Sequence, residues 1–255
     1  MRVDLNADVG EGLGPWPMGD DERLVPLVTS VNVACGAHAG DPATIERTVR
    51  LAVRHGVAVG AHPGYPDLIG FGRRDLDMPL DEVEASIVYQ VGAVAAFARA
   101  EGVALRHVKP HGALYNRAAR DAALAWAIAA GVRRAAPEAV LVGLADSELV
   151  AAGRAQGLAV AGEAFADRAY EPDGSLRSRR LAGALLESPA AAADQAVAIV
   201  RDGRVATSDG GSIAVRAETL CVHGDTPGAA EIAAAVRGAL ESAGVEIKAL
   251  EPGAG

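Results

Sequence analysis

"HVKPHGALYN", residues 107–116, places Lys109 and His111 at the end of a segment that otherwise has the apolar character of a buried strand. Residues two apart in a strand point to the same face, so a strand that continues through this stretch puts both side chains on one side. A hydrocarbon core does not accommodate such a pair, because burying charged and polar groups without partners costs free energy. The stretch therefore predicts a strand that ends in a functional site.

Seven short apolar segments recur along the chain, and stretches of helical character separate most of them. The apolar segments cover residues 2–10, 30–36, 57–64, 105–114, 139–145, 158–165 and 219–225. The helical stretches cover residues 42–55, 80–101, 117–135, 146–156, 188–202 and 227–243. Strands that alternate with helices indicate an α/β fold with a parallel sheet. An open doubly wound sheet satisfies this pattern too, but the number of strands and the polar groups at nearly every strand end favour a closed β/α barrel.

Three of the helical stretches begin with a capping residue that is followed by proline, at Asp41–Pro42, Ser188–Pro189 and Thr226–Pro227. Proline is favoured at the first position of a helix, where its missing N–H is not needed. No linker rich in Pro, Gly or Ser interrupts the series, so we predict a single domain over residues 1–255. Residues 166–187 are charged, turn-rich and too long for a plain connection, which predicts a functional loop or lid.

The composition narrows the class of protein. The chain has 255 residues, half of them hydrophobic, and a formal net charge of −9, which argues against nucleic acid or an anionic membrane surface as the main partner. No segment approaches the roughly 18 uninterrupted apolar residues of a membrane span. The two cysteines, Cys35 and Cys221, are far apart and form no CxxC motif, so we expect a reducing, cytoplasmic location.

Polar residues gather at the carboxyl ends of the predicted strands, where both parallel architectures place their sites. In chain order these ends carry Asn6, Asp8, Glu11, His38, His62, Lys109, His111, Glu163, Asp167, His223 and Asp225. Four of the six histidines are among them, and we interpret only His55 and His107 as structural. Only two of the 24 basic residues are lysines, and a lysine offers a compact charge with a tunable pKa that arginine does not supply.

These residue types suit several chemistries. Asp8, Glu163, His62 and His111 offer acid–base pairs, and Lys109 is suited to stabilise a developing oxyanion. Aspartate with histidines is also a common metal-ligand set, but no signature such as HExxH is present, so a metal at the barrel mouth is left open and no ligand is predicted. There is no GxSxG elbow and no P-loop.

A glycine-rich stretch, "AHPGYPDLIGFGRR" at residues 61–74, is predicted to form a loop at the mouth of the barrel. Arg73 and Arg74 in this loop are placed to clamp a carboxylate or a phosphate. A solvated surface turn is the alternative interpretation. The thiol of Cys35 has apolar flanks, which favours a buried structural cysteine over a nucleophile.

Six motifs together resemble the LamB/YcsF family, which is the family of the A subunit of 5-oxoprolinase. They are "DLNADVGEG", "NVACGAHAGDP", "GAHPGYPDLIGFGRR", "VKPHGALYN", "EAFADRAY" and "CVHGDTP", and they occur in the order of the family. The resemblance covers roughly residues 2–248. It implies an irregular seven-stranded β/α barrel similar to the polysaccharide deacetylases.

The resemblance also implies an activity, namely the ATP-dependent opening of 5-oxo-L-proline to L-glutamate in a complex with the B and C subunits. ATP, with Mg²⁺, is the expected cofactor. The chemistry of such a reaction gives Lys109 an oxyanion or phosphate role, Asp8 or Glu163 the role of base, and His62 and His111 proton transfer. The residues expected to hold substrate or phosphate are Asn6, His38, Arg73, His223 and Asp225.

Two other functions stay open at this point. The first is a metal-dependent deacetylase or amidohydrolase on the same barrel, with Asp8, His62 and His111 as ligands. The second is a non-catalytic subunit that binds 5-oxoproline and presents it to its partners.

Overall fold

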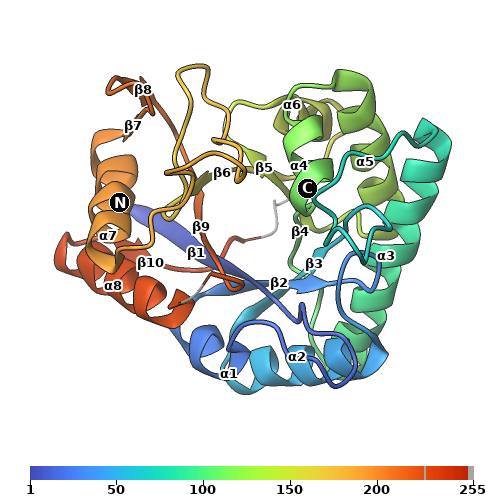
Figure 1. Ribbon diagram of the computed structural model, residues 1–255. Coiled ribbons are helices and arrows are strands. Elements are labelled where there is room, and N and C mark those ends of the chain that lie inside the picture. Colours follow the sequence, from blue (N-terminus) through green and yellow to red (C-terminus); the bar gives the residue numbers. More distant parts are fainter. Residues whose placement is uncertain (227, 252–255) are drawn as a thin grey trace.

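Seven parallel strands form a closed barrel in the computed structural model of the chain, which describes residues 1–226 and 228–251 (Figure 1). The barrel strands are β1 (Arg2–Val9), β2 (Ser30–Ala34), β3 (Ala58–His62), β4 (His107–Val108), β5 (Val140–Leu144), β6 (Val160–Phe165) and β9 (Thr219–His223). Each strand pairs with the next in this order, and β1 pairs with β9 to close the ring. The predicted irregular, seven-stranded parallel β/α barrel is confirmed.

Helices surround the strands on the outside of the barrel (Figure 1). They are α1 (Asp21–Leu24) with the 3-10 turn η1 (Val25–Leu27), α2 (Pro42–Arg54), α3 (Leu80–Ala100), α4 (Gly112–Ala118), α5 (Ala122–Ala135), α6 (Glu148–Ala155), α7 (Pro189–Val197) with the π-helical turn η2 (Ala198–Asp202), and α8 (Ala229–Ser242). Within the described residues, no helix combines the length and the apolar character that crossing a membrane requires.

The structure departs from the predicted elements in three places. Residues 117–135 were expected to form one helix but contain parts of two, because the Asp121 side chain accepts a hydrogen bond from the Leu124 N–H and begins α5 anew. A second, two-stranded sheet was not among the predicted elements: β8 (Ser212–Ala214) pairs antiparallel with β7 (Arg204–Ala206). A short β10 (Glu246–Ile247) also pairs with the start of β1.

Two of the three predicted helix caps are confirmed. Asp41 and Ser188 each accept a hydrogen bond from the backbone of the first turn, with proline at the first helical position. The third is wrong in position: α8 begins at Ala229 with Gly228 as its N-cap, so Thr226 does not cap it. Pro227 lies outside the described residues.

Strand β4 is short, yet its pairing with β3 extends into the site. The N–H of Lys109 donates to the Ala61 carbonyl (3.0 Å), and the N–H of His111 donates to the Pro63 carbonyl (2.8 Å). Pro110 lies between these two donors, so its missing N–H does not interrupt the pairing with β3. The backbone therefore stays extended long enough to carry both side chains to the barrel mouth.

The interior of the barrel is polar, whereas the main apolar core lies between strands and helices. On β1, Val3, Leu5, Ala7 and Val9 belong to that apolar core, and the intervening Asp4, Asn6 and Asp8 point the other way. Asp4 at the bottom of the barrel accepts hydrogen bonds from the hydroxyls of Thr29 (2.8 Å), Ser30 (2.6 Å) and Thr219 (2.6 Å). The polar side chains of β1 thus have hydrogen-bond partners from the N-terminal end of the strand to the mouth of the barrel.

We predict that Asp41→Ala lowers the free energy of unfolding by about 1 kcal/mol at neutral pH, because an N-cap is lost. Asp41 also accepts hydrogen bonds from the Gly14 N–H and the Thr44 hydroxyl, and these contacts hold its pKa at about 2, below the ordinary value of 3.8. The stability that ionised Asp41 contributes is therefore complete above pH 3.8 and is lost as the pH falls through about 2.

Denaturant titrations across this pH range test the prediction. The difference between wild type and Asp41→Ala should shrink toward acid pH. The control is Ser188→Ala, which removes an uncharged cap and should cost the same at every pH in the range. An Asp41→Ala difference that stays constant down to about pH 2 would contradict the account.

Candidate active site

A pocket of about 930 Å³ opens at the carboxyl ends of the strands, which is where the sequence predicts the site. Strand ends and the residues just beyond them contribute to its lining, among them Asp8, His62, Lys109, His111, Leu144, Phe165 and His223. The segment 172–180 forms another part of the wall. The predicted loop at residues 166–187 is therefore part of the pocket.

The ammonium group of Lys109 is the central charge at the floor of this pocket. Its Nζ lies 3.1 Å from Asp8 Oδ1 and 2.9 Å from Glu163 Oε1, and it donates to Asn6 Oδ1 (3.3 Å) and Cys221 Sγ (2.9 Å). The side chain is buried, which by itself lowers the pKa of a lysine, but Asp8 and Glu163 raise the pKa of Lys109 well above its ordinary value. Lys109 is thus held as a cation.

Asp8 connects this lysine to the histidines above it. One carboxylate oxygen, Oδ1, accepts hydrogen bonds from the Lys109 ammonium group and from the Asn32 side-chain amide (2.8 Å). The other oxygen, Oδ2, lies 3.4 Å from His62 Nε2. Burial alone would raise the pKa of Asp8, but His62 and Lys109 hold it well below its ordinary value. Asp8 is therefore a carboxylate, able to accept a proton from a neighbour.

Glu163 and Asn6 lie beneath the pocket. Glu163 is fully buried, and its Oε1 accepts from Asn6 Nδ2 (2.9 Å) as well as from Lys109. His107 also lies at this level, where its Nε2 is 2.7 Å from Asn32 Oδ1 and burial lowers its pKa to about 3. These residues set the position of Lys109 and Asp8 from below.

His62 and His111 form a pair whose outer nitrogens each meet a backbone carbonyl. His62 Nδ1 lies 2.7 Å from the Lys109 carbonyl, and His111 Nε2 lies 2.9 Å from the Phe71 carbonyl. The inner nitrogens, His62 Nε2 and His111 Nδ1, are 3.0 Å apart. Burial and the neighbouring histidines lower the pKa of His111 well below its ordinary value.

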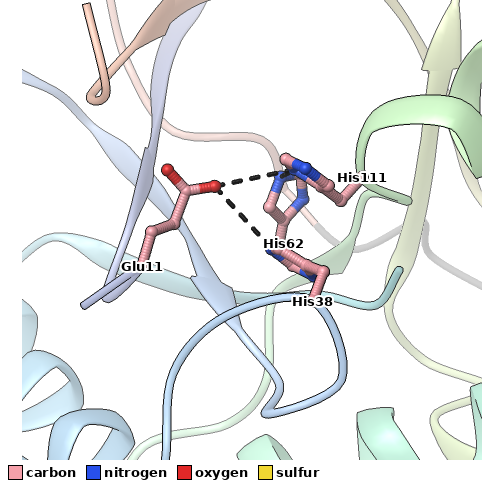
Figure 2. Close-up of side chains that lie close together, drawn as sticks. All are labelled: Glu11, His38, His62 and His111. Carbon is pink, nitrogen blue, oxygen red and sulfur yellow. Dashed lines mark hydrogen bonds and ion pairs between the residues drawn. The ribbon is translucent and has the colours of Figure 1, made fainter. Parts of the chain in front are cut away.

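Two further residues, Glu11 and His38, complete a group of four around this pair (Figure 2). One donor atom from each of Glu11, His38, His62 and His111 lies within 4.8 Å of all the others. Glu11 Oε1 is 3.6 Å from His111 Nδ1 and 3.7 Å from His38 Nε2. Burial and Asp8 raise the pKa of Glu11 well above its ordinary value. This group could hold a metal ion, and so could a second one made of Asp8, Cys221 and His223.

A histidine–carboxylate pair stands on the other side of the pocket. His223 Nδ1 lies 3.0 Å from both carboxylate oxygens of Asp167, which also accepts the His223 backbone N–H (2.9 Å). The His223 ring stacks on Phe165, with 5.4 Å between the centroids. Because Asp167 engages Nδ1, the other ring nitrogen is left for a ligand or a proton.

The wall and rim of the pocket are rich in arginine. Seven arginines line it, namely Arg73, Arg74, Arg120, Arg168, Arg177, Arg179 and Arg180, against three carboxylates, Asp8, Asp146 and Asp173. Arg168 is buried, which lowers its pKa to about 10, and it donates to the carbonyls of Ala184 (3.3 Å) and Arg177 (2.6 Å). Four of the seven form ion pairs with carboxylates outside the lining: Arg73 and Arg179 with Asp225, Arg74 with Asp67, and Arg177 with Glu171. The guanidinium groups of Arg120, Arg168 and Arg180 form no ion pair among the described residues, and they favour an anionic ligand.

The predicted site residues fall into two sets. Asp8, His62, Arg73, Lys109, His111 and His223 line the pocket. The lining does not include Asn6, His38, Glu163 or Asp225. Arg73 and Asp225, both expected to hold the substrate, form an ion pair with each other at 2.6 Å.

Sequence reasoning gave no role to Glu11 or Asp167, although both were recognised at strand ends. The available signal was their residue type and their position at strand ends. The sequence does not show which residues they contact. Cys35 is a buried free thiol whose pKa is raised by burial, so the interpretation as a structural cysteine is consistent with its surroundings.

Comparisons with known proteins agree with the motifs. The sequence profile of the LamB/YcsF family matches residues 3–254. A protein of Chloroflexus aggregans that is named as the A subunit of 5-oxoprolinase is 57% identical over 97% of this chain and 98% of its own length. Another of that name from Methylococcus capsulatus is 55% identical over 97% of this chain and 95% of its own.

A solved structure extends the agreement to three dimensions. The "Lactam Utilization Protein" of Thermus thermophilus is 51% identical to this chain and superposes with a TM-score of 0.92, over 98% of this chain and 100% of that one. The match covers the barrel and the loops that form its mouth. The chain belongs to the LamB/YcsF family.

Proposed function

We propose that this chain is the A subunit of a multi-subunit 5-oxoprolinase, which opens the lactam ring of 5-oxo-L-proline to L-glutamate in an ATP-dependent reaction. The observation that carries the proposal is the near full-length identity of 50–57% to several proteins named as the A subunit of 5-oxoprolinase. The 51% identical lactam utilization protein gives it further support. The B and C subunits are the proposed partners, and the cytoplasm is the proposed location.

The need for ATP follows from the substrate. A five-membered lactam is an unstrained and poorly electrophilic amide, so water attacks it slowly. Transfer of a phosphoryl group from ATP, with Mg²⁺, to the amide oxygen makes the ring carbon electrophilic. Water then adds to that carbon, and the C–N bond breaks with protonation of the nitrogen, which leaves an acyl phosphate. A second water hydrolyses the acyl phosphate to the carboxylate of L-glutamate and free phosphate. We propose that the assembled enzyme supplies the ATP and that this pocket holds the lactam.

Lys109 is proposed to stabilise the negative charge that develops on the amide oxygen or its phosphoryl group. A cation fixed in a buried site is effective there, because it needs no reorganisation as the charge forms. Glu163 and Asn6 are proposed as positioning residues, since they touch Lys109 rather than the pocket. The arginine-rich wall is proposed to receive the substrate carboxylate.

Proton transfer is assigned to the groups on the two sides of the floor. Asp8 is proposed as the base that activates water, with His62 and His111 passing the proton onward. The His223–Asp167 pair is proposed to protonate the leaving nitrogen through His223 Nε2, and the contact of Asp167 with His223 Nδ1 supports this role. Each of these groups lies at a strand end or just beyond it, so the barrel fixes their separation.

Glutamate release tests the proposal directly. We expect 5-oxo-L-proline to yield glutamate only when this chain, the B and C subunits and ATP are all present. Omission of this chain from the mixture is the control. Glutamate formation by the chain alone without ATP would contradict the proposal and favour a simple amidohydrolase.

Lys109→Met should lower turnover of the assembled enzyme by about 100-fold, the usual loss when a preorganised electrostatic group is removed. Lys248 is the matched control, because it is the only other lysine and lies at the surface in an ion pair with Glu251. Lys248→Met should leave turnover unchanged. Circular dichroism checks that both variants fold.

A Lys109→Met enzyme within about threefold of wild type would exclude the oxyanion role. A rise in KM alone, with turnover kept, would instead indicate a binding role for this chain. In that case the substitution has removed ground-state binding without affecting the reaction step.

Asp167→Asn should reduce turnover by about 100-fold, the lower end of the usual range for general acid–base catalysis. The amide no longer fixes the Nδ1 proton of His223, so the ring loses the tautomer that faces the pocket. Asp209→Asn, in the exposed turn between β7 and β8, is the control. Equal turnover in the two variants would show that the His223–Asp167 pair takes no part in the reaction.

A further inference from the structure

The four-residue group of Glu11, His38, His62 and His111 has polar atoms that the rest of the chain leaves unpaired. Glu11 Oε1 and both ring nitrogens of His38 are buried and have no hydrogen-bond partner among the described residues. Buried polar groups are almost always paired, because an unpaired one keeps its full desolvation cost. Three such atoms in one cluster point to a ligand that the protein chain does not itself provide.

The histidine pair gives a second, independent reason. A carbonyl oxygen only accepts hydrogen bonds, so the nitrogens that meet the carbonyls of Lys109 and Phe71 carry the protons. In neutral rings, His62 Nε2 and His111 Nδ1 then each carry a lone pair and no proton. The two nitrogens face each other at 3.0 Å. Such a contact is repulsive unless a positive centre lies beside it.

A proton and a metal ion are the two candidates for this centre. One added proton would remove the repulsion between His62 and His111 but would leave Glu11 Oε1 without a partner. A divalent ion accepts lone pairs from all three groups. Bonds of about 2.0–2.1 Å in a tetrahedral site separate the donors by about 3.3 Å. The observed separations are 3.0 Å for the two histidines and 3.6 Å for Glu11 to His111.

We propose that Glu11, His62 and His111 bind one divalent first-row transition ion such as Zn²⁺, with His38 in a supporting position beside Glu11. Imidazole nitrogens with one carboxylate suit such ions, whereas Mg²⁺ and Ca²⁺ prefer oxygen ligands. His38 is assigned the outer place because its ring lies parallel to that of His111, at an angle of 1° and a centroid distance of 3.8 Å. Two parallel rings do not direct both in-plane lone pairs at one ion.

The surroundings of the group are those of a built site. Metal-binding histidines usually donate their other N–H to a carbonyl or a carboxylate, as His62 and His111 do here. A Cβ on Gly72 would come within 2.8 Å of His38 Cβ and 2.9 Å of His111 Cδ2. The loop therefore packs closely against both rings and restricts their movement.

This inference does not depend on the proposed reaction, because metal binding is measured without substrate. A bound ion would supply Lewis-acid chemistry next to Asp8 and Lys109 at the pocket floor. Because it would occupy His62 Nε2 and His111 Nδ1, it would take the place of the proton transfer proposed for these two histidines and leave Asp8 as the base. It also changes the ligand set considered from the sequence: His62 and His111 remain, and Glu11 takes the place of Asp8.

The test uses the full chain, stripped with a chelator and titrated with Zn²⁺ by calorimetry and with Co²⁺ by visible absorption. We expect one equivalent to bind, with the d–d bands of a nitrogen–oxygen site. Glu11→Gln and His111→Asn should each raise the dissociation constant at least tenfold. His55→Asn, which removes an exposed histidine, and Cys221→Ser, in the second candidate group, should bind as wild type does.

The wild-type titration decides the matter even if a variant fails to fold. A folded wild-type chain that shows no saturable binding of Zn²⁺ or Co²⁺ would overturn the proposal and leave the proton as the positive centre. A thiolate charge-transfer band with Co²⁺ would place the ion with Cys221 and overturn the ligand assignment. Wild-type affinity in a folded Glu11→Gln variant would do the same.

Discussion

The buried ammonium group of Lys109 is the constraint on which much of the interior depends. A charge inside a protein is tolerated only when it is paired and its hydrogen bonds are satisfied. Asp8 and Glu163 provide the opposite charges; Asn32 also donates to Asp8 and Asn6 to Glu163, while Glu163 Oε2 has no hydrogen-bond partner among the described residues. The barrel interior is therefore a connected polar network, and the apolar core lies outside it, between strands and helices.

The same lysine also orients the histidines through its backbone. Its carbonyl accepts the His62 Nδ1 proton, while its ammonium group contacts Asp8, whose other oxygen faces His62 Nε2. These three residues form a closed ring of contacts across three strands. A shift in any one of them changes the tautomer, the charge or the position of the other two, so the site is set by the barrel as a unit.

Local charge, rather than net charge, decides which ligands suit this pocket. The chain is acidic overall, but seven arginines and three carboxylates line the pocket, and four of the arginines pair with carboxylates outside the lining. Several of these arginines bond to carbonyls or carboxylates of the chain, as Arg168 and Arg73 do. A carbonyl partner holds the guanidinium group of Arg168 in place without neutralising it, whereas the carboxylate of Asp225 cancels part of the charge of Arg73.

The sequence by itself determined the barrel strands and the end of the barrel that carries the site, because hydrophobic periodicity and strand–helix alternation are local properties. It also marked Lys109 and His111, since both are out of place in an apolar strand. Only the tertiary structure decided which of these residues contact one another. Glu11 joins the histidines because Gly10, at φ 67°, turns the chain after β1, and Arg73 meets Asp225 across 152 positions of sequence. Whether a polar residue lines the pocket or lies beneath it depends on the stagger of the closed strands, which periodicity along one strand does not encode.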